Sequence, residues 1–131
     1  MVVINFDFLK DTYPELYKYG HEMEENIDIN EKKSATCAGE FLDELVKLVF
    51  NKNGLNYDPD SLMGKGLDEL QMNKVIPKDV YSLLIRAKQL RDHADLKGGH
   101  EDIIELHAVM GQLAEWFYRK YEDPSFALKF N

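Results

Sequence analysis

The fold is decided by residues 76–123, which read IPKDVYSLLIRAKQLRDHADLKGGHEDIIELHAVMGQLAEWFYRKYED. In both halves apolar residues recur at spacings of three and four, the period that places them on one face of a helix. Between the halves, Gly98 and Gly99 supply the backbone freedom that ends one helix and turns the chain back. The stretch therefore predicts a hairpin of two long helices. The predicted apolar stripes are Val80, Leu83, Leu84, Ala87, Leu90 and Ala94, and then Ile103, Leu106, Met110, Leu113, Ala114, Phe117 and Tyr121.

Upstream of the hairpin, the same period predicts two more long helices and one short helix. The long helices are expected at residues 14–25 and 31–51, and the short one at about 67–73. Thr12 and Glu15 have the spacing of a capping box ahead of the first helix. No stretch alternates for long enough to form a sheet. The sequence therefore predicts an all-α, single-domain bundle of four long helices and one short helix spanning residues 1–131.

The two ends of the chain are expected to lie outside these helices. Residues 1–12 are interpreted as an extended, apolar N-terminal arm that packs against later helices. Residues 124–131 are expected to form a loose tail, which could be a linker to further domains of a longer protein. In that tail, Phe126 and Phe130 would either fold back or belong to an interface.

Charge favours protein partners over an extended nucleic-acid surface. The 131 residues carry 24 acidic and 16 basic side chains, a net charge of -8. Affinity for nucleic acid comes largely from Lys and Arg side chains that neutralise phosphates. Residues 1–60 hold 13 acids and 6 bases, whereas residues 61–131 hold 11 acids and 10 bases, including all three arginines. Any basic patch should therefore lie on the helical hairpin.

The single cysteine and the lack of long apolar runs bear on the compartment. Cys37 excludes an intramolecular disulfide, fits a reducing compartment, and is interpreted as a small buried thiol. No run approaches the length of a membrane span, and the first residues lack the pattern of a signal peptide. The sequence therefore predicts a cytoplasmic protein without a membrane partner.

The motifs that would announce a metal or cofactor are absent from the sequence. No Glu-x-x-His or His-Glu-x-x-His pattern occurs, and Lys65 between two glycines lacks the spacing of a phosphate loop. His100 and Asp102, with neighbouring acids, could collect a cation, but acids in a first helical turn are what the helix dipole favours. His107 falls beside the buried stripe and is interpreted as a hydrogen-bonded core histidine. Neither a metal nor a cofactor is expected.

One constellation on the first helix of the hairpin could carry chemistry. Arg86 and His93 lie seven residues apart, two helical turns along roughly the same side. Such a pair can cleave RNA, with His93 as the acid or base and Arg86 stabilising charge on the phosphate. Arg86, Lys88 and Arg91 are also the candidate nucleic-acid contacts. The alternative is a solvated edge in which these cations pair with neighbouring acids such as Asp92.

Several stretches resemble a known family. They are NFDFLK at 5–10, YPELY at 13–17, AGE at 38–40, LVKLVF at 45–50, VIPKDV at 75–80 and AEWFYRKY at 114–121. Together they resemble the small helical domain at the N-terminus of many type I restriction endonuclease R subunits and related helicases. That domain typically opens with Asn-Phe-x-Phe-Leu and Trp-Pro-Glu-Leu-Tyr and ends in Trp-Phe-Tyr-Arg-x-Tyr. The similarity covers nearly the whole chain.

The resemblance implies two functions. In the R subunits, nuclease and translocase work belongs to other domains, which implies a non-catalytic accessory or interaction domain of a restriction or helicase-type defence system. Its partners would be proteins of that complex, with nucleic acid placed through Arg86, Lys88 and Arg91. The family is also related to HEPN helical bundles, many of which are metal-independent ribonucleases or toxins that act as dimers. That relation implies a homodimeric ribonuclease using Arg86 and His93, although Ala87 stands where a polar residue often follows the HEPN arginine.

A third hypothesis comes from charge alone. The acidic first half of the chain, residues 1–60, could mimic nucleic acid and occupy the basic groove of a partner protein.

Overall fold

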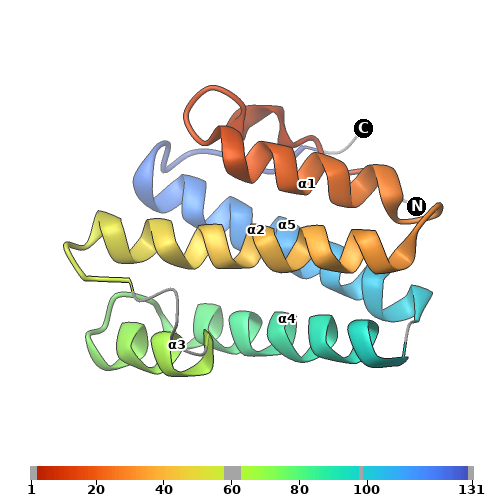
Figure 1. The fold of residues 1–131 in the computed structure, drawn as a ribbon. Helices are drawn as coiled ribbons and strands as arrows, with labels where there is room; N and C mark the ends of the chain where they lie inside the picture. Colours follow the sequence, from red (N-terminus) through yellow and green to blue (C-terminus); the bar gives the residue numbers. More distant parts are fainter. Residues whose placement is uncertain (1–2, 58–62, 98, 130–131) are drawn as a thin grey trace.

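The structure is a computed structural model that describes residues 3–57, 63–97 and 99–129. Figure 1 shows its helical elements, and the described ranges contain no strand. The all-α prediction is confirmed. Gly98 and Phe130, both singled out in the sequence, lie outside the described residues. The elements are the 3-10 helix η1 (Phe6–Leu9) and the α-helices α1 (Pro14–Asn26), α2 (Glu31–Lys52), α3 (Met63–Met72), α4 (Lys78–Lys97) and α5 (His100–Tyr121).

Helix α2 is the centre of the bundle. It contacts α1, α3, α4 and α5. In Figure 1, α1 lies above α2, α4 lies below it, and α5 crosses behind them. The predicted hairpin is present, since α4 packs against α5 and Gly99 is the N-cap of α5. Among the described residues, no helix is both long and apolar enough to cross a membrane.

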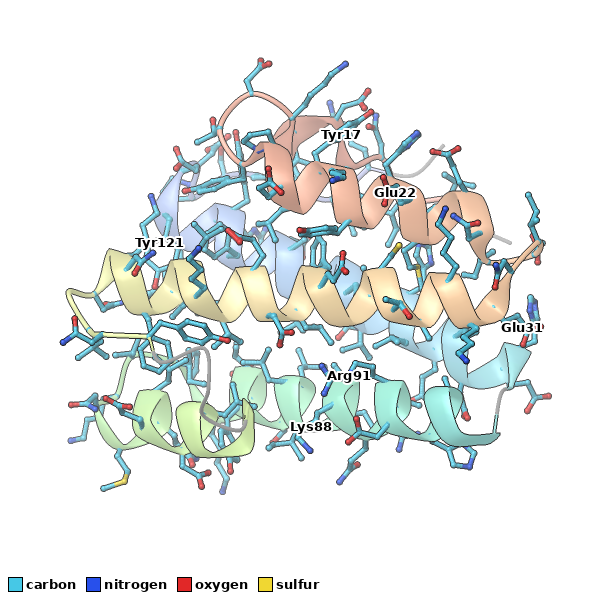
Figure 2. The ribbon with its side chains drawn as sticks, in the orientation of Figure 1. Tyr17, Glu22, Glu31, Lys88, Arg91 and Tyr121 are labelled. Carbon is cyan, nitrogen blue, oxygen red and sulfur yellow. The ribbon has the colours of Figure 1, made fainter. Side chains whose placement is uncertain are left out.

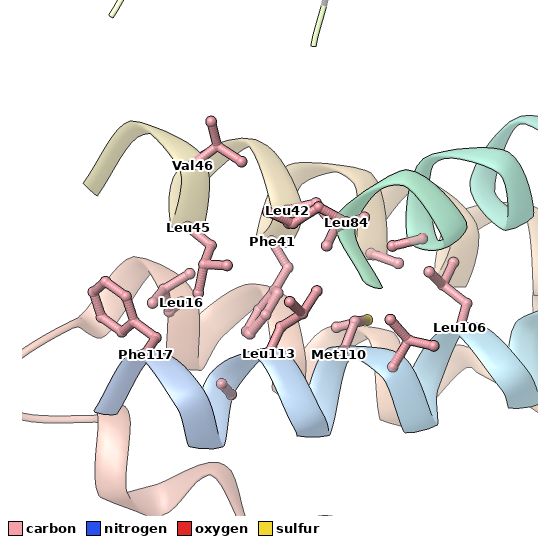
Figure 3. Packing of buried hydrophobic residues seen from close by; sticks show 14 of the residues in the cluster. Leu16, Phe41, Leu42, Leu45, Val46, Leu84, Leu106, Met110, Leu113 and Phe117 are labelled. Carbon is pink, nitrogen blue, oxygen red and sulfur yellow. The ribbon is translucent and has the colours of Figure 1, made fainter. Parts of the chain in front are cut away.

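The apolar stripes of the helices meet in one core. Phe41 of α2 and Phe117 of α5 are fully buried, as is Leu16 of α1. Burying a side chain of this size stabilises a fold by about 1.5–3 kcal/mol. The close-up in Figure 3 shows how side chains of the four long helices pack, among them Leu16, Phe41, Leu42, Leu45, Leu84, Leu106, Met110, Leu113 and Phe117.

The N-terminal arm differs from the prediction in two ways. Phe6–Leu9 forms a 3-10 helix instead of an extended segment, because the Asn5 side chain caps it by accepting a hydrogen bond from the Asp7 amide at 3.0 Å. The capping box at Thr12 is wrong as well. The N-cap of α1 is Tyr13, which makes no side-chain capping bond. The helix itself begins at Pro14, as predicted, but η1 leads almost directly into it, and the Tyr13 N–H donates to the Leu9 carbonyl.

The described part of the tail is packed instead of loose. The Phe126 ring packs on both Phe8 of η1 and Tyr118 of α5, with ring centroids 4.4 and 4.8 Å away, and these two rings also contact each other. The Asn5 N–H donates to the carbonyl of Lys129 at 2.9 Å, which ties the tail to the arm. The rings of Phe8 and Tyr118 thus form an apolar surface that Phe126 of the tail covers. Of the two alternatives for Phe126, the structure shows that it folds back.

The short helix begins earlier than the sequence predicts. It spans Met63–Met72, whereas a start near residue 67 is expected because two glycines precede it. Gly66 lies inside the helix, and a β-carbon added there would come 3.7 Å from the Phe50 ring. This glycine therefore sits where α3 approaches the end of α2, in the helix and not ahead of it.

Candidate functional site

Arg86 and His93 lie on the same side of α4, as their spacing predicts, and both meet α5. Arg86 donates from Nε and Nη2 to the two carboxylate oxygens of Glu105, at 2.7 and 2.9 Å. His93 Nδ1 contacts the carboxylate of Asp102. The two carboxylates are three residues apart on α5, so they too share one side of their helix. Each candidate catalytic side chain is therefore held by an acid of the neighbouring helix.

The Arg86 pair is a two-point interaction. Its hydrogen bonds raise the pKa of Arg86 and lower the pKa of Glu105, so both groups stay charged across the physiological range. Both side chains are about half exposed. Bidentate pairing uses the planar guanidinium in the geometry that would otherwise receive a phosphate. A phosphate at this place would have to displace Glu105 and then tolerate its negative charge nearby.

The His93 pair has a different chemical meaning. A carboxylate bound to one imidazole nitrogen orients the ring and leaves the other nitrogen for proton transfer, the arrangement found in acid–base catalysis. His93 contacts Asp102 through Nδ1, so Nε2 is the nitrogen that could transfer a proton. Its side chain is 56% exposed. Of the predicted pair, His93 is the residue whose geometry is compatible with an acid or base.

Arg91 and Lys88 point away from that pair. They follow Arg86 by five and two residues, which places them on the opposite side of α4 at 3.6 residues per turn. Figure 2 shows Arg91 between α4 and α2. There its guanidinium lies 3.9 Å from Asp43 and 3.4 Å from Asp92, and its side chain is 25% exposed. Lys88 pairs with Asp92 at 3.2 Å.

The close approach of Arg91 to α2 depends on a glycine. A β-carbon added at Gly39 would lie only 2.7 Å from Cδ of Arg91. Burial raises the pKa of Asp43, and the charge of Arg91 opposes this shift. The three predicted nucleic-acid contacts, Arg86, Lys88 and Arg91, thus each have a carboxylate partner and do not form one patch.

His107 is a core histidine, as the sequence predicts. Its Nε2 lies 2.8 Å from the carboxylate of Glu24, and the two side chains are 5% and 9% exposed. The same Glu24 oxygen accepts the Ile4 N–H at 2.7 Å. Glu24 could not be predicted from the sequence, because no local pattern distinguishes it from its neighbours Glu22 and Glu25. This contact joins α1, α5 and the N-terminal arm.

The remaining candidate residues have structural surroundings. Cys37 is buried, as expected, and burial raises the pKa of its thiol, with the nearby carboxylate of Glu22 adding to the shift. His100 contacts Asp28 and Glu31, at 3.5 and 3.6 Å, instead of the acids of its own helical turn. Among the residues described, no three His, Cys, Asp or Glu side chains are grouped so that they could hold a metal ion.

Similarity to known proteins does not identify the chain. No protein-family model matches it, and neither a curated protein nor a solved structure does. The resemblance to the helical domain of restriction R subunits and helicases therefore rests on the motifs quoted above. In the structure, motif residues such as Ala38, Phe50 and Phe117 are buried in the core. These motifs thus describe packing, and the function has to be inferred from the chemistry of the site.

Proposed function

We propose that this chain is a non-catalytic helical interaction domain that serves a restriction or helicase-type defence system through contacts with proteins of that complex. One observation carries the proposal: the guanidinium of Arg86, the candidate charge-stabilising group, is held by both carboxylate oxygens of Glu105 on α5. The acidic balance of the chain and the resemblance to the R-subunit domain support it as well.

The Arg86–Glu105 contact argues most directly against catalysis. Stabilising a phosphoryl transition state requires positive charge that becomes available where negative charge develops. In this protein the guanidinium is neutralised by a two-point hydrogen bond, and the carboxylate remains beside it. Cleavage would therefore require the loss of an existing interaction instead of the use of a preorganised one.

The surroundings of the other cations favour proteins over nucleic acid as partners. Lys88 and Arg91 contact carboxylates, as Arg86 does, but they lie on the side of α4 opposite to Arg86. A nucleic-acid surface gains affinity when several cations replace counterions along the phosphate chain. Arg86, Lys88 and Arg91 are paired with carboxylates and lie on two sides of α4, so they do not form a continuous row of cations for a phosphate chain. Placing nucleic acid would therefore be a secondary role of this domain.

A second candidate function has one specific observation in its favour. The contact between His93 and Asp102 orients an exposed imidazole as an acid or base would be oriented. A metal-independent ribonuclease of the HEPN type, acting as a homodimer, would use this histidine together with an arginine from either copy.

One experiment separates the two candidates. Purified wild-type chain and the double variant Arg86→Ala, His93→Ala are incubated with mixed-sequence RNA and DNA, and the mass in solution is recorded for the same samples. We expect no cleavage by either protein. Cleavage by the wild type that the folded double variant lacks would refute the proposal and establish the ribonuclease. Cleavage that is equal in both would identify a contaminating nuclease, which an Asp102→Asn variant would also leave unchanged.

A further inference from the structure

A groove runs between the first half of α4 and the second half of α5, farther along these two helices than the Arg86–Glu105 contact; its wall residue Leu83 precedes Arg86 by three residues. Its volume is about 510 Å³, within the range of about 300–1,000 Å³ in which proteins bind small ligands and anchor side chains. Val80 and Leu83 of α4 and Trp116 of α5 supply its apolar wall. Val80 is buried, whereas Leu83 and Trp116 are half-buried and so keep part of their apolar surface in contact with water.

Two cations stand at the end of this groove. Arg119 and Lys120 line it one turn beyond Trp116, and both side chains are exposed. Within the part of the chain that the structure describes, neither takes part in an ion pair: Arg119 donates from Nε to the Phe126 carbonyl, and Lys120 lies 6.0 Å from the centre of the Trp116 ring. The other two arginines of the chain are both paired with carboxylates. Positive charge is therefore available here and not on the predicted face of α4.

The two acids that line the groove are already engaged with the backbone. The Asp79 carboxylate accepts the Val80 N–H at 3.0 Å, and the Glu115 carboxylate accepts the Leu128 N–H at 2.7 Å. These hydrogen bonds hold the acids toward the start of α4 and toward the tail. An incoming anion would be attracted by the two cations of α5, which line the groove one turn beyond Trp116.

We propose that this groove docks a short segment of a partner protein in which an apolar side chain stands next to a carboxylate. The apolar side chain packs on Trp116 and Leu83, and the carboxylate binds Arg119 and Lys120. Trp and Arg are the residue types that most often dominate binding energy at protein interfaces, and the guanidinium fork matches a carboxylate. The inference rests on the proposed function, since it names the surface and the partner chemistry of an interaction domain.

Charge favours a peptide over a nucleic-acid strand as the occupant. An aromatic ring beside cations could also stack a base and bind a phosphate. However, a strand brings one negative charge with every nucleotide, whereas the groove has two cations that no described carboxylate pairs with, two acids nearby and a protein of net charge -8 around it. A segment with one or two carboxylates meets much less repulsion.

The test is a selection followed by a binding measurement. A random library of short peptides displayed on phage is selected against the full chain, and the consensus peptide is synthesised with a fluorescent label. Its binding is measured by anisotropy to the wild type and to the variants Trp116→Ala and Arg119→Gln, Lys120→Gln. The control variant is Lys32→Gln, Lys33→Gln, which removes the same charge from exposed positions at the start of α2. A labelled oligothymidylate is measured beside the peptide.

We expect the consensus to combine an acidic residue with an apolar or aromatic one. Binding should weaken about thirtyfold in the Trp116 variant, the loss typical of an interface hot spot. It should weaken at least about tenfold in the Arg119 and Lys120 variant, whose exposed positions leave the fold intact, and stay within about twofold in the control. Circular dichroism verifies that each variant is folded.

Three results would overturn the inference. The first is a selection that returns no peptide, or a basic one. The second is a consensus peptide that binds the wild type and both groove variants equally well. The third is an oligothymidylate that binds the wild type but not the groove variants, while peptides do not bind. In each case the proposed function still stands as long as the Arg86 and His93 assay shows no cleavage. Cleavage that depends on these two residues refutes the proposed function whatever the groove binds.

Discussion

Replacing Glu24 by alanine tests the buried contact that joins the N-terminal arm to the helices. The Glu24 carboxylate receives the Ile4 N–H at 2.7 Å and lies 2.8 Å from His107 Nε2, in a site almost closed to water. Alanine would leave both groups buried without this partner. Leaving one buried polar group unsatisfied costs about 1–3 kcal/mol, so the two together should lower the free energy of unfolding by about 2–6 kcal/mol. A domain of this kind has only about 5–15 kcal/mol in total.

Urea unfolding followed by circular dichroism measures this loss, and two variants serve as controls. Glu24→Gln keeps one side-chain oxygen, which can take the place of the single Glu24 oxygen that makes both contacts, so it should lose less than Glu24→Ala. Glu25→Ala removes the next acid along α1, which is 60% exposed and pairs with His21 at the surface. Exposed pairs of that kind are worth about 0.2–1 kcal/mol. If Glu24→Ala cost no more than Glu25→Ala, the assignment of Glu24 as a buried anchor would be refuted.

Two further predictions concern the packing around α2 and the alkaline stability of the fold. Gly39→Ala should change the free energy of unfolding little, because the roughly 1 kcal/mol gained in helix propensity is offset by displacement of the Arg91 side chain. In an Arg91→Ala background the same change should stabilise the fold by about 1 kcal/mol, measured by urea unfolding. Equal effects in the two backgrounds would contradict the contact between Gly39 and Arg91. Burial, with a hydrogen bond to Glu122, raises the pKa of Tyr13 well above its ordinary value. Above about pH 10 the unfolded chain therefore releases a proton from Tyr13 that the native state keeps. The free energy of unfolding then falls as the pH rises. Tyr13→Phe removes this contribution, so its unfolding free energy should decline less steeply between about pH 10 and 11.5, and parallel curves for the two proteins would show that Tyr13 does not contribute.

The helices could be predicted from the sequence because their causes are local. A period of three and four residues fixes which face of each helix is apolar, and that face is buried wherever the bundle provides a partner. The all-α fold, the hairpin of α4 and α5, and the buried state of Cys37 and His107 all follow from such patterns. The pairing of the arm with the tail did not follow, because Asn5 and Lys129 lie at opposite ends of the chain.

The chemistry of the candidate site could not be predicted in the same way. The spacing of Arg86 and His93 correctly puts them on one side of α4, but it is silent about what faces them. Only the packing of α4 against α5 brings Glu105 and Asp102 onto these side chains. Hydrogen bonds act over about 3 Å, so which carboxylate meets which cation depends on how two helices are aligned, to within a fraction of a helical turn.

The sequence by itself thus determined the order of the α-helices, their apolar faces and the uneven charge of the two halves. The tertiary structure alone decided which of those charges are neutralised and which remain available. Arg86 and Arg91 are paired with carboxylates across helices, whereas Arg119 lines a groove beside Trp116 and pairs with no carboxylate of the described residues. The physical reason is that helix formation depends on neighbours in the chain, while the partner of a charged side chain depends on which helices the core packs together.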